Sequence, residues 1–247
     1  MSAPSGLEGP AGIALGGGPH VLGLLFDLGG TLDADGIGWS ERFASLLRAE
    51  IPEAAAPAVE AALASGEQRV LRHPRAATLG LEEMVSLHVA AQLEHLRAAD
   101  PARAARIAKV FYEETSATLA GRRPLLARLA RRVRLGVVSN GCGNTERLLR
   151  EAGLADFFAS IVDSAEAGAW KPDPRIFAPA LAALALAPRE VAMAGDRLDR
   201  DVEAAAAAGL RSVWVSGGRR LDPDHPLASR VDLVVASVEA LGAEGAA

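Results

Sequence analysis

Cysteine is almost absent from this chain: Cys142 is the only one in 247 residues. An intrachain disulfide is therefore impossible, and the composition suits a reducing compartment, so we expect a cytoplasmic protein. No apolar stretch reaches the ~18–20 residues of a membrane-spanning helix, which argues against a membrane partner. Basic residues are not in excess, since the formal net charge is −5. That balance argues against a nucleic-acid-binding surface.

The first 18 residues also lack a basic segment and are rich in Gly, Pro and Ala. They do not resemble a signal peptide, and we expect residues 1–18 to be a disordered leader. Half of the chain is hydrophobic, which is enough for a substantial core. The length fits one large domain or two unequal ones.

Between residues 36 and 120 the pattern is helical. Apolar residues recur at helical spacing, with Pro and Gly between the segments. The predicted helices are Trp39–Ala49, Ala56–Arg72, Leu81–Arg97 and Pro101–Leu119. Ser40 is expected to cap the first of them. No strand is expected here, so residues 36–120 are predicted to form an inserted helical domain.

From Pro124 onward, strands and helices alternate. After the first apolar run, Val21–Phe26, the predicted strands are Val133–Ser139, Ser160–Asp163, Val191–Ala194, Arg211–Val215 and Asp232–Val235. The predicted helices are Asn144–Ala152, Arg175–Ala185 and Asp199–Ala208, and Val238–Leu241 opens a last one. This alternation is typical of a parallel sheet covered on both faces. We predict an α/β fold: a doubly wound parallel sheet formed by residues 19–35 and 121–247, with the helical domain inserted after its first strand.

Chemically active residues follow several of these strands. Asp27 ends the first run, Ser139 ends the second strand, and Asp196 follows the strand at Val191–Ala194. Lys171 precedes a predicted helix, and Asp201 lies five residues after Asp196. Ligands of such sheets bind at the carboxyl ends of the strands, so we expect these side chains to meet.

This set of residues suits phosphoryl transfer. Mg²⁺ prefers carboxylate, water and phosphate oxygens. A carboxylate can attack phosphorus to form an aspartyl-phosphate, which divides one difficult step into two. A lysine can neutralise charge on the transferring group, and a hydroxyl and glycine amides can hold its oxygens.

Four segments resemble, in order, the motifs of the haloacid dehalogenase (HAD) superfamily: FDLGGTL, VVSNG, KPDPRIF and AGDRLDRDVEAAAAAGL. The resemblance covers roughly residues 19–35 and 121–240. One such motif is weak, but four in order are specific. The helical segment in the first gap resembles the C1 cap, a bundle that closes over the active site.

The resemblance implies a role for each matching residue. Asp27 matches the nucleophile and Lys171 the lysine that steadies nucleophile and phosphate. The residues matched to the substrate are Thr31, Gly30, Ser139, Asn140 and Lys171. The residues matched to Mg²⁺ are Asp27, Gly29 through its backbone carbonyl, Asp196 and Asp201. The expected ligand is a small phosphorylated metabolite, bound by a monomer or homodimer.

Gly29 departs from the family pattern. Phosphatases of this family usually carry an Asp there, which protonates the leaving group and then activates water. Loss of such acid–base help typically costs ~10²–10⁴ in rate. A good leaving group, the cap or the substrate can reduce this cost. Asp33 and Asp35 follow closely, and either carboxylate could swing in.

Four functions remain open at this point. A magnesium-dependent phosphatase fits Asp196 and Asp201 best. A 2-haloacid dehalogenase needs neither a leaving-group acid nor a metal, so Gly29 would be natural in it. A phosphonatase would need a cap lysine, and the predicted cap contains only Lys109. A catalytically weak binding protein that kept the fold is the fourth.

Several other polar residues are assigned structural roles. Each main candidate, taken alone, could also be a loop or capping residue; these candidates are Asp27, Asp196, Asp201 and Lys171. The cap histidines His73, His88 and His95 do not share a metal-ligand spacing. Cys142 is read as a small loop residue, Trp39 as a packing residue near the cleft, and Arg69, Arg72 and Arg75 as solvated helix residues.

Overall fold

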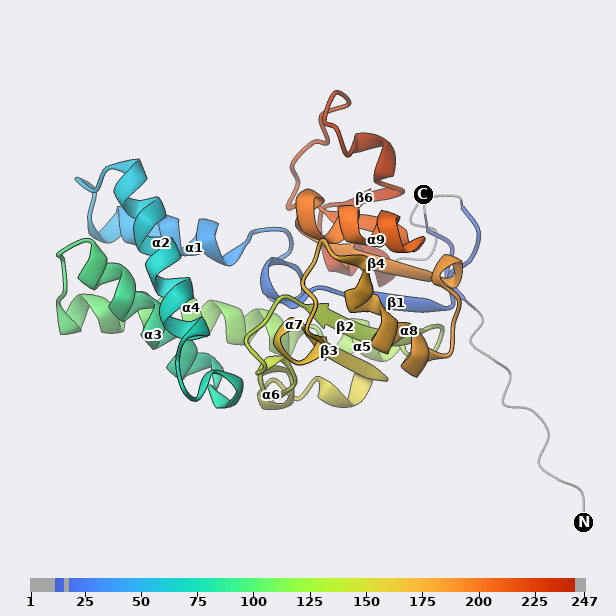
Figure 1. Cartoon of the computed structure of the whole chain (residues 1–247), viewed down its shortest axis with the longest axis horizontal. Coiled ribbons are helices and arrows are strands. Elements are labelled where there is room, and N and C mark those ends of the chain that lie inside the picture. Colours follow the sequence, from blue (N-terminus) through green and yellow to red (C-terminus); the bar gives the residue numbers. More distant parts are fainter. Residues whose placement is uncertain (1–11, 16–17, 243–247) are drawn as a thin grey trace, which may run out of the picture.

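The part of the chain that the structure describes is built on a six-stranded parallel sheet. The structure is a computed structural model, and it describes residues 12–15 and 18–242. The strands are β1 (Gly23–Phe26), β2 (Arg134–Ser139), β3 (Ser160–Asp163), β4 (Val191–Gly195), β5 (Arg211–Val215) and β6 (Leu233–Val235). Their order is β3-β2-β1-β4-β5-β6, with every neighbouring pair parallel. The predicted doubly wound sheet is confirmed, with β1 and β4 at its centre (Figure 1).

Nine α-helices are found in the described part of the chain. They are α1 (Trp39–Glu50), α2 (Ala56–Leu71), α3 (Leu81–His95), α4 (Pro101–Gly121), α5 (Arg123–Leu129), α6 (Thr145–Glu151), α7 (Ser164–Ala167), α8 (Ala178–Leu184) and α9 (Glu203–Ala208). Short helical turns are Leu28–Leu32, Ala76–Thr78, Ala155–Phe157, Pro174–Phe177, Pro188–Glu190, Leu198–Val202, Ala228–Arg230 and Val238–Gly242. Across the described ranges, no helix combines the length and apolar character needed to cross a bilayer.

Some predicted helices differ from those in the structure. The helix predicted at Arg175–Ala185 is divided into a 3₁₀ turn, Pro174–Phe177, and α8. The last predicted helix is a 3₁₀ turn rather than an α-helix. The prediction that Ser40 caps α1 is wrong, because α1 begins at Trp39 and its N-cap is Gly38.

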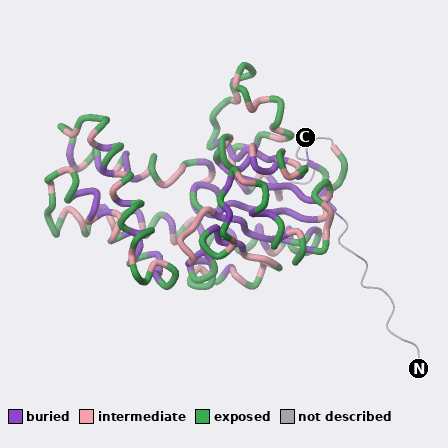
Figure 2. The backbone as a smooth tube through the Cα atoms, in the orientation of Figure 1, coloured by how far each residue is buried: buried purple, intermediate pink, exposed green. Residues whose placement is uncertain are grey.

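The two faces of the sheet pack against different helices. Leu24 and Phe26 of β1 belong to an apolar cluster that includes residues of α5 and α6. Leu25 points to the opposite face and belongs to a cluster with residues of α8 and α9. Successive side chains of a strand alternate in this way, so a strand buried on both faces is apolar throughout. Figure 2 shows the strands as the buried layer of this part of the molecule.

Helices α1 to α4 form an insertion between β1 and α5. They lie beside the sheet rather than on either face of it, as Figure 1 shows at the left. Aromatic rings fill part of the interior of the insertion: Phe43 stacks on Phe111 with ring centroids 3.9 Å apart, and Trp39 meets Phe111 edge-on at 4.9 Å. These contacts join α1 to α4, the first and last helices of the insertion.

Part of the expected N-terminal leader belongs to the core. Residues 1–11 and 16–17 lie outside the described residues. Ile13 pairs with Val21 in an antiparallel bridge, and both Ile13 and Leu15 are buried. Residues 12–15 are therefore ordered against the sheet, because these two apolar side chains complete the cluster beside β1.

His88 gives the insertion a dependence on pH. Its ring stacks on Phe43, and burial lowers its pKa to about 4 from 6.5. Between these two values the unfolded chain binds a proton that the folded chain does not, so stability falls as pH drops from about 6.5 towards 4. We expect the wild type to lose up to about 2 kcal/mol more unfolding free energy between pH 7 and pH 5 than His88→Leu, measured by urea denaturation. Equal losses in the two proteins would contradict this.

Candidate active site

The predicted site residues meet at the carboxyl ends of the central strands. Asp27 directly follows β1, which lies between β2 and β4. Ser139 ends β2, and Asp196 directly follows β4. The backbone N–H of Asp27 donates to the carbonyl of Ala194 at 2.9 Å, so the pairing with β4 continues to the site. The sheet itself therefore fixes the spacing of these three side chains.

Three carboxylates form one buried cluster. Oxygens of Asp27, Asp196 and Asp201 all lie within 4.8 Å of one another. The side chain of Asp27 is 10% exposed, and that of Asp201 is 2% exposed. Gly30 allows the loop after β1 to approach this cluster, because its φ is +93° and a Cβ there would lie 2.6 Å from Asp196 Oδ2. Only glycine fits this position.

Lys171 is the cation of the cluster. Its Nζ lies 2.5 Å from Asp27 Oδ1 and 2.7 Å from Asp201 Oδ1, and it donates to the carbonyl of Val138 at 2.7 Å. Burial lowers the pKa of Lys171, but the charges of Asp201 and Asp27 outweigh this and leave the pKa above its usual value. The ammonium therefore remains charged and is held beside Asp27.

The cluster carries more negative than positive charge. Burial raises the pKa of Asp27 to about 8; Lys171 opposes this rise, and the charges of Asp201 and Asp196 add to it. Burial, followed by repulsion from Asp201, raises the pKa of Asp196 to about 6. Three carboxylates thus share one ammonium. Hard oxygen donors at this spacing fit a divalent cation such as Mg²⁺, which would relieve the repulsion between them.

Asn140 braces the lysine loop. Its Nδ2 donates to the carbonyl of Lys171 at 2.9 Å, and its Oδ1 accepts from the N–H of Lys171 at 2.8 Å. Both ends of the amide are therefore engaged with the chain itself, although Asn140 also lines the cleft described below.

Thr31 and Gly30 also make internal contacts. The hydroxyl of Thr31 is buried and lies 3.4 Å from Asp196 Oδ1, to which it donates. The N–H of Gly30 donates to Asp33 Oδ1 at 2.6 Å. Thr31 therefore lies against Asp196, and the amide of Gly30 already has an acceptor.

Asp33 and Asp35 are both engaged with other groups. Asp33 Oδ2 accepts from the indole of Trp39 at 2.5 Å, and burial raises the Asp33 pKa against the hydrogen bonds from Trp39 and Gly30. Asp35 pairs with Arg122 at 2.6 Å and accepts from the N–H of Val238. Neither carboxylate is free to swing towards Asp27.

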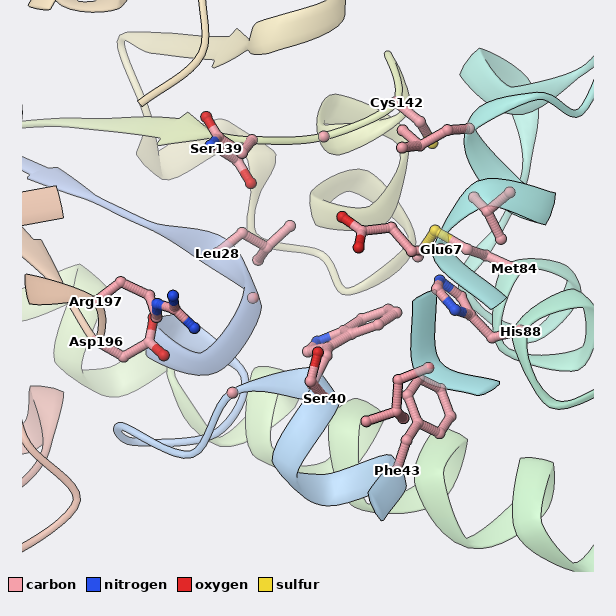
Figure 3. A pocket seen from close by; sticks show the side chains of 18 of the residues that line it. Leu28, Ser40, Phe43, Glu67, Met84, His88, Ser139, Cys142, Asp196 and Arg197 are labelled. Atoms are coloured by element: carbon pink, nitrogen blue, oxygen red, sulfur yellow. The ribbon is translucent and has the colours of Figure 1, made fainter. Parts of the chain in front are cut away.

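A cleft of about 440 Å³ lies between this strand edge and the helical insertion. On the core side it is lined by Gly29, Ser139 and Asp196, with Arg197 at its edge (Figure 3). The insertion contributes Trp39, Phe43, Leu63, Glu67, Val70, Met84 and His88. Leu28 and Gly29 bring the cleft to the residue next to Asp27. A small molecule in this cleft would contact both halves of the structure.

Gly29 leaves an open position in the cleft wall. Its φ and ψ are −78° and 113°, which any residue can adopt. A Cβ added there would meet only Trp39 Cδ1 and Nε1, both at 3.5 Å. The carboxyl group that is expected here from the family pattern is therefore missing for lack of a side chain and not for lack of room.

The haloacid dehalogenase-like hydrolase family matches residues 21–209. This chain belongs to that family. The match begins just before β1 and includes β4 and α9, so it contains the whole carboxylate cluster and Lys171. The chain is thus a hydrolase built on the HAD core, and the resemblance inferred from the four sequence motifs is confirmed at that level.

Its curated relatives include phosphatases. A phosphoserine phosphatase of Thermus thermophilus is 41% identical over 138 residues, which cover 52% of this chain and 53% of the relative. A glyceraldehyde 3-phosphate phosphatase of Methanopyrus kandleri is 38% identical over 91 residues, covering 36% and 39%. A haloacid dehalogenase-like hydrolase domain-containing protein 3 of Bos taurus is 40% identical over 111 residues, covering 45% and 42%. The chain thus matches about half, or less, of each relative's length.

Solved HAD structures share the fold over most of the chain. The HAD-hydrolase YfnB of Bacillus subtilis bound to magnesium has a TM-score of 0.55 at 23% identity, with 90% of this chain and 96% of that chain covered. The L-2-haloacid dehalogenase of Xanthobacter autotrophicus has a TM-score of 0.54 at 19% identity, with 90% and 97% covered. At these identities the likeness establishes the HAD fold and leaves phosphatase and dehalogenase chemistry equally open.

Sequence reasoning missed the part played by Asp33, Trp39 and Glu67. Trp39 lines the cleft as well as packing against Phe111, and Asp33 fixes its indole. The signal for Asp33 was its place in the loop after Asp27, but its bonds to Gly30 and Trp39, three and six residues away, are not predictable from spacing. Glu67 looked like any exposed helical acid, and only the packing of α2 beside the core brings it to the cleft.

Proposed function

We propose that this HAD hydrolase is a magnesium-dependent phosphatase of a small phosphorylated metabolite, and that it acts through an aspartyl-phosphate on Asp27. The observation that carries the proposal is the buried carboxylate cluster around Lys171, with Nζ 2.5 Å from Asp27 Oδ1. A dehalogenase has no need of such an excess of negative charge beside its nucleophile. Phosphatase relatives with 38–41% identity support the same choice.

Each residue of the cluster has a role in the proposed reaction. Asp27 attacks phosphorus with the carboxylate oxygen that is not paired with Lys171, and the ammonium of Lys171 steadies both the nucleophile and the transferring oxygens. Asp27, Asp196, Asp201 and the carbonyl of Gly29 would hold Mg²⁺, which supplies charge neutralisation for the phosphoryl group when bound.

The remaining residues orient the substrate or support those that do. Ser139 lines the cleft next to the cluster and is proposed to donate its hydroxyl to a phosphate oxygen. Asn140 acts on the substrate through the position of Lys171. Thr31 and Gly30 act through the loop and Asp196. Residues 36–120 are proposed to be a cap domain over the core formed by 19–35 and 121–247, since both sides line the cleft.

Phosphonate cleavage through a cap lysine has little support. Lys109 is 68% exposed and pairs with Glu113 one helical turn away on α4. A Schiff-base lysine needs a desolvated amine of low pKa. The cleft-lining residues also include no lysine among those described.

Metal removal tests the proposal. With Mg²⁺ the purified protein should hydrolyse p-nitrophenyl phosphate or acetyl phosphate, EDTA should abolish the activity, and added Mg²⁺ should restore it. Asp196→Asn should weaken the response to Mg²⁺, whereas Asp199→Asn, at an exposed position paired with Arg197, should not.

Other outcomes would point to the competing functions. Absence of turnover on a broad phosphate panel by the folded protein would reject the phosphatase. Chloride release from 2-chloropropionate that survives EDTA would support a dehalogenase. Ligand-induced stabilisation without turnover would support a binding protein that kept the fold.

A further inference from the structure

The proposed phosphatase reaction needs a proton donor that position 29 does not provide. When the bond from phosphorus to the leaving oxygen breaks, an alkoxide or phenoxide leaves unless a proton reaches it. The donor must line the cleft beside Gly29, because that is where the substrate lies next to Asp27. The identity of this donor rests on the proposed phosphatase function.

Most titratable groups near the cleft are unsuited to this task. Asp33 and Asp35 are engaged in hydrogen bonds and ion pairs, and neither of them lines the cleft. His88 lines the cleft, but its lowered pKa leaves the ring neutral at pH 7, so it holds no imidazolium proton to give. The Cys142 thiol donates to Asn144 Oδ1 at 3.1 Å, and burial raises its pKa to about 11.

The carboxylates that line the cleft within the described chain are Asp196, Glu41 and Glu67. Asp196 belongs to the buried cluster and accepts from Thr31. Glu41 lies two residues after Trp39 on α1, about 200° around the helix, so it cannot face Gly29 when Trp39 does. Glu67 remains.

Glu67 occupies the face of α2 that lines the cleft. Leu63, Val70 and Leu71 lie four residues before, three after and four after Glu67, and all of them line the cleft. These spacings place the four side chains on one helix face. Glu67 is therefore the one acid in an otherwise apolar stripe. Figure 3 shows its carboxylate extending from the insertion into the cleft, towards the core side where Ser139 lies.

The carboxylate of Glu67 is also uncommitted. It takes part in no ion pair among the residues described, and the nearby Arg69 pairs with Glu94 at 2.6 Å instead. A carboxyl group that no cation holds is free to give and to take up a proton beside the leaving oxygen. A protonated carboxyl beside the leaving oxygen is a proton donor.

We propose that Glu67 of the insertion replaces the missing acid–base group of position 29. Asp27 attacks phosphorus, the bond to the leaving oxygen breaks, and that oxygen takes the proton of the Glu67 carboxyl. The Glu67 carboxylate then takes a proton from a water molecule as the water oxygen attacks phosphorus. The bond from phosphorus to Asp27 breaks, which restores the Asp27 carboxylate and the Glu67 acid and releases phosphate.

Leaving-group dependence tests this role. With Mg²⁺ present, Glu67→Gln should lower kcat for phenyl phosphate about tenfold more than kcat for p-nitrophenyl phosphate, because the poorer leaving group depends more on the proton. KM should change little or fall, since a repulsive charge is removed. Glu41→Gln is the matched control: it removes another cleft-lining acid and should leave the ratio of the two rates as in the wild type.

Repeating the measurement in a protein that carries an acid at position 29 makes the test specific to proton donation by Glu67. In Gly29→Asp protein, adding Glu67→Gln should no longer change the ratio, because the carboxyl group introduced at position 29 supplies the proton. Equal losses on both esters, no loss, or the same loss in the Gly29→Asp background would overturn the role of Glu67 while leaving the phosphatase intact. A wild type that hydrolyses neither ester would instead reject the phosphatase proposal on which this role rests.

Discussion

Replacing Asp27 with Asn should lower kcat by about 10⁴-fold or more while leaving the chain folded, because an amide oxygen cannot form the aspartyl-phosphate. The substitution keeps the size of the side chain. It also keeps an acceptor for Lys171, whose Nζ lies 2.5 Å from Asp27 Oδ1. The measurement is steady-state hydrolysis of p-nitrophenyl phosphate with Mg²⁺ by the wild type and by Asp27→Asn.

The stability of the Asp27→Asn variant gives a second readout. Burial and the charges of Asp201 and Asp196 raise the pKa of Asp27, so its carboxylate destabilises the metal-free fold. In EDTA the variant should have a Tm equal to or above that of the wild type, as is common when an active-site charge is removed. Asp173→Asn is the control, because Asp173 pairs with the exposed Arg175 and lies outside the cleft. If Asp27→Asn retains more than about 1% of wild-type activity, the role of Asp27 is contradicted.

Gly29→Asp should raise the rate of phosphate-ester hydrolysis by about tenfold in the wild-type background and by about 10² in Glu67→Gln, within the range of general acid–base catalysis. The backbone accepts the side chain because φ is −78°, and the new Cβ would lie in ordinary contact with Trp39, at 3.5 Å. The carboxyl group would then lie in the cleft wall next to Asp27. The gain should be largest for phenyl phosphate, the ester with the poorer leaving group.

Gly29→Asn separates acid–base chemistry from shape. Asn fills the same space and has the same contact with Trp39, but it cannot transfer a proton as a carboxyl does. The rate should rise only in Gly29→Asp. An unchanged or lower rate in Gly29→Asp, with Gly29→Asn alike, would show that position 29 does not limit turnover.

The sheet was predictable because its strands are short, mostly apolar segments that alternate with helical segments along the chain. The predicted strand bounds agree with the structure to within a residue or two, as at Ser160–Asp163 and Arg211–Val215. The break between the Pro174–Phe177 turn and α8 was not predictable, since the apolar spacing continues across it. Packing against the sheet decides such breaks, and spacing along the chain does not report it.

The site was predictable to the level of which residues meet. Ser139 ends β2, and Asp27 and Asp196 directly follow the neighbouring strands β1 and β4, so the topology alone brings the three residues together. Hydrogen-bond partners were not predictable: Asn140 holds the Lys171 loop, and Thr31 holds Asp196. These pairings depend on loop conformations that no periodicity encodes.

The position of the helical insertion relative to the core could not be predicted from the sequence either. Glu67 is separated from Asp27 by a loop and more than one helix, and its spacing predicts only a place on α2. Trp39 was read mainly as packing, whereas its indole also forms the cleft wall against Gly29. Contacts between distant helices and a strand edge arise from tertiary packing. The residues that line the cleft therefore became known only from the structure.

The path of the water oxygen tests the central claim most directly. The wild type hydrolyses p-nitrophenyl phosphate with Mg²⁺ in H₂¹⁸O. The masses of the released phosphate and of the peptide that contains Asp27 are then measured by mass spectrometry. If water attacks phosphorus of an aspartyl-phosphate, ¹⁸O appears in phosphate and Asp27 remains unlabelled, and an acid quench during turnover yields phosphorylated Asp27. Two results would contradict the account. One is accumulation of ¹⁸O in the Asp27 carboxylate, which is expected when water attacks a carbon ester of that group. The other is turnover with no phosphorylated Asp27 in either the wild type or a slowed variant.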